Sequence, residues 1–130
     1  MLPTSTAAVR PVADSLLGSP ALDDLLTHVT PRGSYKPLVG QRTNSGKDLY
    51  RYVVWLEIDP RFVDQVASVR YRFNHPTFGI NGYVASQAPQ FSTTYDGWGC
   101  VDSVTATINT RSGPPQNLEF NQCAAIVSTR

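Results

Sequence analysis

Neither sign of charge dominates this chain of 130 residues, which carries 11 Lys and Arg against 10 Asp and Glu for a net charge of +1. A protein that binds nucleic acid without sequence specificity needs a broad positive field, because the phosphate backbone supplies most of that affinity. The balance of charge therefore gives no reason to expect a nucleic-acid partner.

Long apolar runs are also absent. No segment reaches the ~20 apolar residues that a transmembrane helix needs. Arg10 and Pro11 interrupt the N-terminal stretch where a secretory signal peptide would need an unbroken apolar run. We therefore expect no membrane association and a cytoplasmic location.

Cysteine occurs only twice, at Cys100 and Cys123, and neither has the spacing to another Cys or His that a metal site requires. A chain of this length can bury a sufficient core without cross-links. We therefore interpret both residues as buried thiols on strands, in a reducing compartment. They could form a disulfide only if their strands were neighbours in the sheet. The sequence predicts no metal and no cofactor.

Residues 1–46 differ from the rest of the chain in being rich in Pro, Ser, Thr and Gly, which predicts a mostly irregular N-terminal arm. One short amphipathic helix is expected near residues 20–29. Four apolar residues repeat there at helical spacing, namely Leu22, Leu25, Leu26 and Val29. This helix could pack on the domain or dock a partner.

From about residue 47 the pattern changes to the period of two that is typical of strands. The clearest case has one apolar face made by Tyr50, Tyr52, Val54, Leu56 and Ile58. Further strands are predicted at about 69–73, 91–95, 104–109 and 118–127, with turn signals and no long helical pattern between them. The sequence therefore predicts an all-β fold, an antiparallel β-sandwich over residues 47–130.

Two motifs in this half of the chain carry a family resemblance. VRYRFNHPTF at residues 69–78 ends a strand, and Gly97-Trp98-Gly99 precedes another. In this combination the chain resembles the YEATS domain, in its prokaryotic version, over about residues 48–113. The resemblance implies an immunoglobulin-like β-sandwich that acts as a non-catalytic protein-recognition module.

The resemblance also implies a binding site, because the characterised eukaryotic members hold acetylated or crotonylated lysine between two aromatic side chains. Phe78 and Trp98 would form the two walls, the Thr77 hydroxyl would contact the acyl amide, and His75 would order its loop. Acylation removes the charge of lysine and leaves a flat amide, a group that stacks on aromatic faces. The implied partner is a protein or peptide that carries an acylated lysine or a similar flat neutral side chain. The predicted ligand-binding residues are His75, Thr77, Phe78, Gly97, Trp98 and Gly99.

A structural interpretation of the same residues stays open. Phe78 could plug the end of the sandwich and Trp98 could cover its core. The chain would then be an assembly domain whose sheet edges and N-terminal arm bind other subunits. His75 has no catalytic partner in its own motif, so we expect no enzyme activity. Trp55, on the outer face of its strand, indicates a contact with the arm or with another protein.

Overall fold

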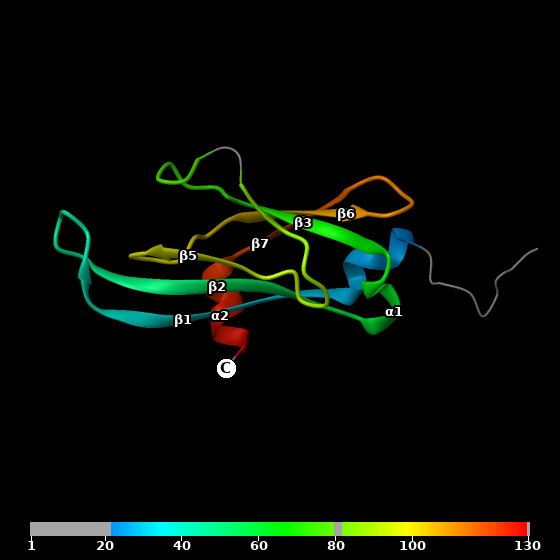
Figure 1. Cartoon of the computed structure of the whole chain (residues 1–130). Coiled ribbons are helices and arrows are strands. Elements are labelled where there is room, and N and C mark those ends of the chain that lie inside the picture. Colours follow the sequence, from blue (N-terminus) through cyan, green and yellow to red (C-terminus); the bar gives the residue numbers. More distant parts are fainter. Residues whose placement is uncertain (1–21, 80–81, 130) are drawn as a thin grey trace, which may run out of the picture.

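The computed structural model describes residues 22–79 and 82–129, and in it two antiparallel sheets form two packed layers (Figure 1). One sheet has the strand order β1-β2-β5 and the other the order β4-β3-β6-β7. This architecture confirms the predicted β-sandwich. The strands are β1 (Val29–Arg42), β2 (Asp48–Ile58), β3 (Val66–Phe73), β4 (Tyr83–Ala85), β5 (Thr93–Gly97), β6 (Val104–Thr110) and β7 (Gln116–Phe120).

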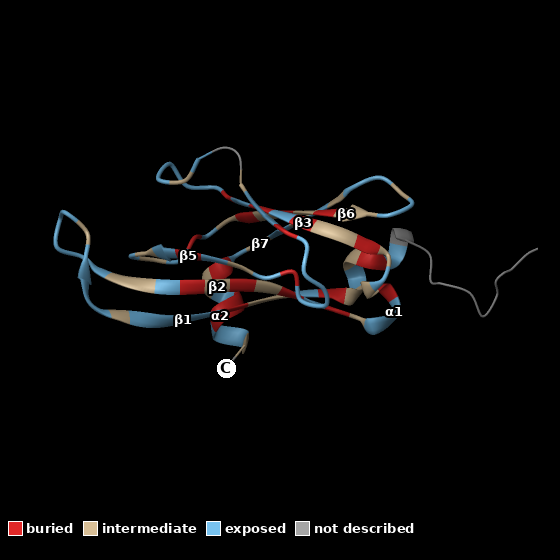
Figure 2. Ribbon diagram, viewed as in Figure 1, coloured by how far each residue is buried: buried red, intermediate tan, exposed pale blue. Residues whose placement is uncertain are grey.

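The core lies between the sheets, where the inward faces of the central strands are buried (Figure 2). β2 shows the predicted alternation. Val54 and Leu56 are fully buried, whereas Arg51 and Glu57 are exposed. One face of each strand therefore packs on the opposite sheet while the other meets solvent or a covering element.

Val29 was expected in the short helix and residues 30–42 were expected to be irregular, and instead they form the edge strand β1. β1 pairs with β2 from Val29↔Ile58 to Pro37↔Tyr50. Gly33 directs its N–H away from β2, where it donates to Thr129 Oγ1 (3.1 Å). Pro31 and Pro37 are separated from Gly33 by an even number of residues, so their backbone nitrogens also face away from β2. A proline is tolerated at such a position because β2 needs no N–H there. Turn-forming residues are therefore compatible with this strand.

A 3-10 helix, η2 (Leu22–His28), occurs where the short helix was expected near residues 20–29, of which 20 and 21 lie outside the described part of the chain. Leu25 is fully buried and belongs to the core. η2 therefore covers the end of the sandwich at which β1 begins and β2 ends (Figure 1).

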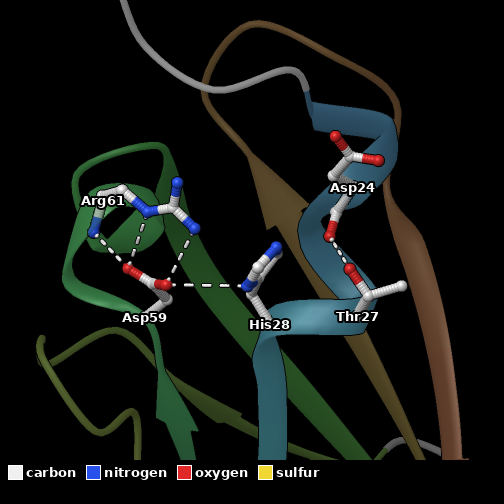
Figure 3. Close-up of polar contacts among 5 residues, drawn as sticks. All are labelled: Asp24, Thr27, His28, Asp59 and Arg61. Carbon is white, nitrogen blue, oxygen red and sulfur yellow. Dashed lines mark hydrogen bonds and ion pairs between the residues drawn. The ribbon is translucent and has the colours of Figure 1, made fainter.

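The helix α1 (Pro60–Val63) lies beside η2 and shares polar and aromatic contacts with it (Figure 3). The ring of His28 stacks on Phe62 with 5.1 Å between centroids. The carboxylate of Asp59, the N-cap of α1, accepts hydrogen bonds from Arg61 and lies 3.5 Å from His28 Nδ1. These contacts tie the end of η2 to the turn that follows β2.

The strand predicted at residues 118–127 is wrong beyond Phe120. β7 ends there, and the helix α2 (Gln122–Thr129) follows and packs against β1. A short apolar run such as residues 123–127 does not by itself distinguish a strand from a helix.

The interpretation of the two cysteines as free thiols on strands is also wrong. Cys100, in the loop after β5, and Cys123, in α2, form a disulfide with 5.4 Å between their Cα atoms. The cysteines therefore no longer indicate a reducing compartment, and a cytoplasmic location stays a prediction. Within residues 22–79 and 82–129, no helix has the length and apolar character needed to cross a membrane.

Candidate functional site

A pocket of about 420 Å³ opens at the end of the sandwich remote from η2. Its walls come mostly from the β1–β2 hairpin, the loop after β3, and the end of β5 with the loop that follows it. These segments lie at the same end of the molecule in Figure 1. The pocket is lined by all six predicted ligand-binding residues, His75, Thr77, Phe78, Gly97, Trp98 and Gly99. The topology thus brings together two motifs that are separate in the sequence.

Phe78 forms part of the inner wall. Its ring stacks on the buried ring of Phe73, with 4.9 Å between centroids, and meets the ring of Tyr95 edge-on at 5.0 Å. Tyr83 completes the cluster at 6.4 Å from Phe78. Phe78 is therefore half-buried in an aromatic cluster that continues into the core.

Trp98 is 45% exposed and forms the outer wall. The ring of His75 approaches it at 6.0 Å, with an interplanar angle of 79°. The structure describes both Trp98 and Phe78, and their rings do not contact each other. The space beside Trp98 is therefore not filled by stacking of these two walls on one another.

His75 and Thr77 are joined in a small hydrogen-bonded unit. The Thr77 N–H donates to His75 Nδ1 (3.3 Å), and Thr77 Oγ1 lies 2.9 Å from the same nitrogen. Because Nδ1 accepts from the backbone N–H, it also accepts from the Thr77 hydroxyl, which keeps its oxygen lone pairs for another donor. The Phe78 N–H donates to the His75 carbonyl (3.0 Å), so the whole loop is ordered around His75.

Gln122 holds the loop behind Trp98. This side chain is fully buried, and its Oε1 accepts from the Val101 N–H (2.8 Å) and the Tyr95 hydroxyl (2.9 Å). The Tyr95 hydroxyl also lies 2.9 Å from the Gly99 carbonyl. Burial raises the pKa of Tyr95, so its hydroxyl stays a donor at neutral pH.

Gly97 lies where a side chain would disturb this arrangement. A Cβ added at Gly97 would come within 3.0 Å of Tyr95 Cε1. The disulfide of Cys100 attaches the same loop to α2. The segment that carries Trp98 is therefore fixed by close packing, by hydrogen bonds and by a covalent link.

Two carboxylates near the pocket are paired with arginines. Asp96 lines the pocket and accepts two hydrogen bonds from Arg51 (2.9 and 3.1 Å), which hold the pKa of its carboxyl below the usual value. Asp48, at the start of β2, lies 3.1 Å from Arg42 Nε. Neither carboxylate is left to attract a cationic ligand.

Lys47, in the β1–β2 turn, is a charged residue near the pocket that is not part of such an ion pair within residues 22–79 and 82–129. Its Nζ lies over the Trp98 ring, 4.0 Å from the centroid. Among the residues that the structure describes, no carboxylate forms an ion pair with it. The rim of the pocket thus carries one positive charge that no neighbouring acid balances.

Sequence reasoning missed part of this pocket. Tyr95 could have been found, because it precedes Gly97 by two residues in β5 and so shares its face of the strand. The hairpin residues Thr43 and Leu49 belong to no motif, so no signal in the sequence could have identified them. The lining residues that were not predicted are Thr43, Leu49, Tyr83, Thr94, Tyr95, Asp96, Cys100 and Val101.

The sandwich and the pocket can be compared with known proteins. Residues 50–123 match the model of the prokaryotic YEATS domain, a match that covers more than half of the chain. The chain belongs to the prokaryotic YEATS family. The resemblance inferred from the two motifs is thereby confirmed.

Among solved structures, this prokaryotic YEATS domain is similar to the Yaf9 YEATS domain recognizing the H3K122suc peptide. The two chains are 11% identical with a TM-score of 0.53, over 75% of this chain and 78% of the other. At this level of identity the similarity concerns the fold alone. No curated protein matches the chain.

Proposed function

We propose that this prokaryotic YEATS domain is a non-catalytic recognition module that binds an acylated lysine of a partner protein in the pocket between Phe78 and Trp98. The observation that carries the proposal is that six residues named from two separate motifs line one open pocket. The family membership supports it. So does the Yaf9 structure, a domain of the same fold whose ligand is the H3K122suc peptide.

The pocket offers complementary groups for an acylated lysine. Trp98 is 45% exposed and its aromatic ring suits the flat amide. Aromatic stacking of this kind contributes about 0.5–1.5 kcal/mol beyond burial. Thr77 Oγ1 has lone pairs for the amide N–H, because its own proton is directed to His75. The amide carbonyl needs a donor in return, which a backbone N–H near Trp98 would supply.

Unmodified lysine lacks these advantages. Its ammonium would lose hydration in the pocket. The cation–π contact that Trp98 could offer in return is already made by Lys47. The nearby carboxylate of Asp96 is already engaged by Arg51. The pocket therefore favours acyl-lysine over lysine.

Thr77 and His75 have the types of a nucleophile and a base, but they lack a third group to orient them. No carboxylate contacts His75 among the residues that the structure describes, and its Nδ1 already accepts the Thr77 N–H. Catalytic His–hydroxyl pairs need such an orienting group. We assign the pair to ordering the loop.

Peptide titration tests the proposal. We expect an acetyl-lysine peptide to bind the wild type more tightly than the same peptide with unmodified lysine. Trp98→Ala should weaken binding by at least about tenfold, or ~1.4 kcal/mol. The matched control is Trp55→Ala, since Trp55 lies on β2 and lines a different hollow. Equal affinity for the two peptides, or binding that is indifferent to Trp98, would contradict the proposal.

The alternative function, assembly with other subunits, would use another surface. The edge of β1 is poorly suited to strand pairing, because Pro31 and Pro37 offer no N–H and Thr129 occupies the N–H of Gly33. Tyr35 on β1 and Val127 on α2 are both exposed and line one hollow, and they form the apolar surface that favours this alternative. Self-association in solution that Val127→Ser abolishes would support assembly.

A further inference from the structure

We propose that the pocket prefers acyl groups that end in a carboxylate, such as succinyl, and that Lys47 determines this preference. The inference rests on the proposed function, because it concerns which acylated lysine occupies the same pocket. It is carried by the position of the Lys47 ammonium and by the pairing of the charges around it.

Lys47 is held at the rim by its own turn. Its N–H donates to Thr43 Oγ1 (3.1 Å), and its carbonyl accepts from the Thr43 N–H (2.8 Å). Thr43 and Leu49, on either side of Lys47, both line the pocket. The side chain thus starts from an ordered turn and ends over Trp98, a ring that lines the same pocket.

The charge of Lys47 is available to a ligand. Asp48, which follows Lys47 in the sequence, is bonded to Arg42, and Asp96, in the pocket lining, is bonded to Arg51. The contact of an exposed ammonium with an aromatic face is weaker than a charge-assisted hydrogen bond to a carboxylate. An anionic ligand therefore draws the ammonium away from Trp98 at small cost.

A carboxylate-terminated acyl chain uses this charge, whereas an acetyl group does not. The lysine stem is flexible and carries three donors, so it can follow a carboxylate at the pocket opening. The carboxylate of a short acyl chain stacked on Trp98 would lie near Lys47, because the Lys47 ammonium is 4.0 Å from the centroid of that same ring. The same positive charge repels the ammonium of unmodified lysine.

The test compares three peptides of one sequence, carrying succinyl-lysine, acetyl-lysine and unmodified lysine. We expect the wild type to bind the succinyl peptide about fivefold more tightly than the acetyl peptide, the size expected of one exposed ion pair. The preference should shrink with added salt. Lys47→Gln should abolish it while leaving the acetyl peptide nearly unaffected, and Lys47→Glu should reverse it.

The matched control is Lys36→Gln, because Lys36, on β1, is the only other lysine of the chain. This variant loses the same charge and should keep the preference. Equal affinity for the two acyl peptides in the wild type, or a preference that survives in Lys47→Gln, would overturn the role of Lys47 and leave the proposed function standing. Failure of both acyl peptides to bind the wild type would instead overturn the proposed function, and this inference with it.

Discussion

Tyr71 shows how one side chain orders a distant loop. It is fully buried in β3, and its hydroxyl donates to the Phe91 carbonyl at 2.6 Å. Phe91 is also buried and has a φ of 49°, in the left-handed region that residues with a bulky side chain rarely adopt. The hydrogen bond satisfies a buried carbonyl and holds the backbone in this conformation, just before β5.

Removal of the Tyr71 hydroxyl should therefore lower the stability of the fold. Tyr71→Phe keeps the ring but leaves the Phe91 carbonyl without its partner, which should lower the free energy of unfolding by about 1–3 kcal/mol. Urea unfolding followed by circular dichroism measures the change. Tyr83→Phe, at an exposed ring, is the control and should change stability by less than about 0.5 kcal/mol. Equal stability of the two variants would contradict this role of Tyr71.

Two aspartates should govern stability in acid. Hydrogen bonds from Arg61 lower the pKa of Asp59, and hydrogen bonds from Arg51 lower the pKa of Asp96. A carboxyl whose pKa is lower in the folded state stabilises the fold above its unfolded pKa of about 3.9. That contribution is lost as the pH falls through the folded-state pKa.

We therefore expect the free energy of unfolding to fall as the pH drops below about 4. The double variant Asp59→Asn, Asp96→Asn should be less stable at neutral pH and should depend less on pH in this range. Chemical unfolding at a series of pH values measures both effects. An acid dependence as steep as that of the wild type would show that these carboxylates do not contribute to it.

At the scale of elements, the disulfide connects the pocket to the C-terminal helix. Cys100 lines the pocket next to the loop that carries Trp98, and Cys123 lies in α2 beside the buried Gln122. α2 in turn packs on β1, and none of its residues lines the pocket. The helix therefore supports the loop that carries Trp98 from outside the pocket.

Loss of this link should affect stability and binding together. The two cysteines are 23 residues apart, and a disulfide that closes a loop of this size typically contributes about 2–4 kcal/mol. The double variant Cys100→Ser, Cys123→Ser should have a free energy of unfolding lower by that amount. It should also bind the acetyl-lysine peptide more weakly than the wild type does. Addition of a reductant should act on the wild type in the same way and leave the double variant unchanged. A wild type that is insensitive to reductant in both measurements would contradict the role of the disulfide.

At the scale of the whole molecule, the topology places the pocket. β3 belongs to one sheet and β5 to the other, so the loops after them meet at the open end between the layers (Figure 1). The long β1–β2 hairpin reaches the same end and adds Thr43 and Leu49 to the lining. The opposite end is closed by η2 and α1, so the pocket lies at the end that these helices do not cover.

The sequence predicted those parts of the fold that depend on local pattern. β2 and β3 followed from alternation, and the two motifs led to six residues of one pocket. β1 was missed because Pro31 and Pro37 are turn signals in most contexts, and only its position at the edge of a sheet makes them compatible with a strand. The disulfide and the approach of Lys47 to Trp98 are contacts between distant segments, which no local pattern encodes.

The central claim is that an acylated lysine binds against Trp98. The chain has two tryptophans, Trp55 and Trp98, so its NMR spectrum contains two indole N–H signals, which Trp55→Phe assigns. We predict that an acetyl-lysine peptide shifts the Trp98 signal and leaves the Trp55 signal in place, and that the unmodified peptide shifts neither. A Trp98 signal that stays in place at millimolar acetyl-lysine peptide would contradict the account.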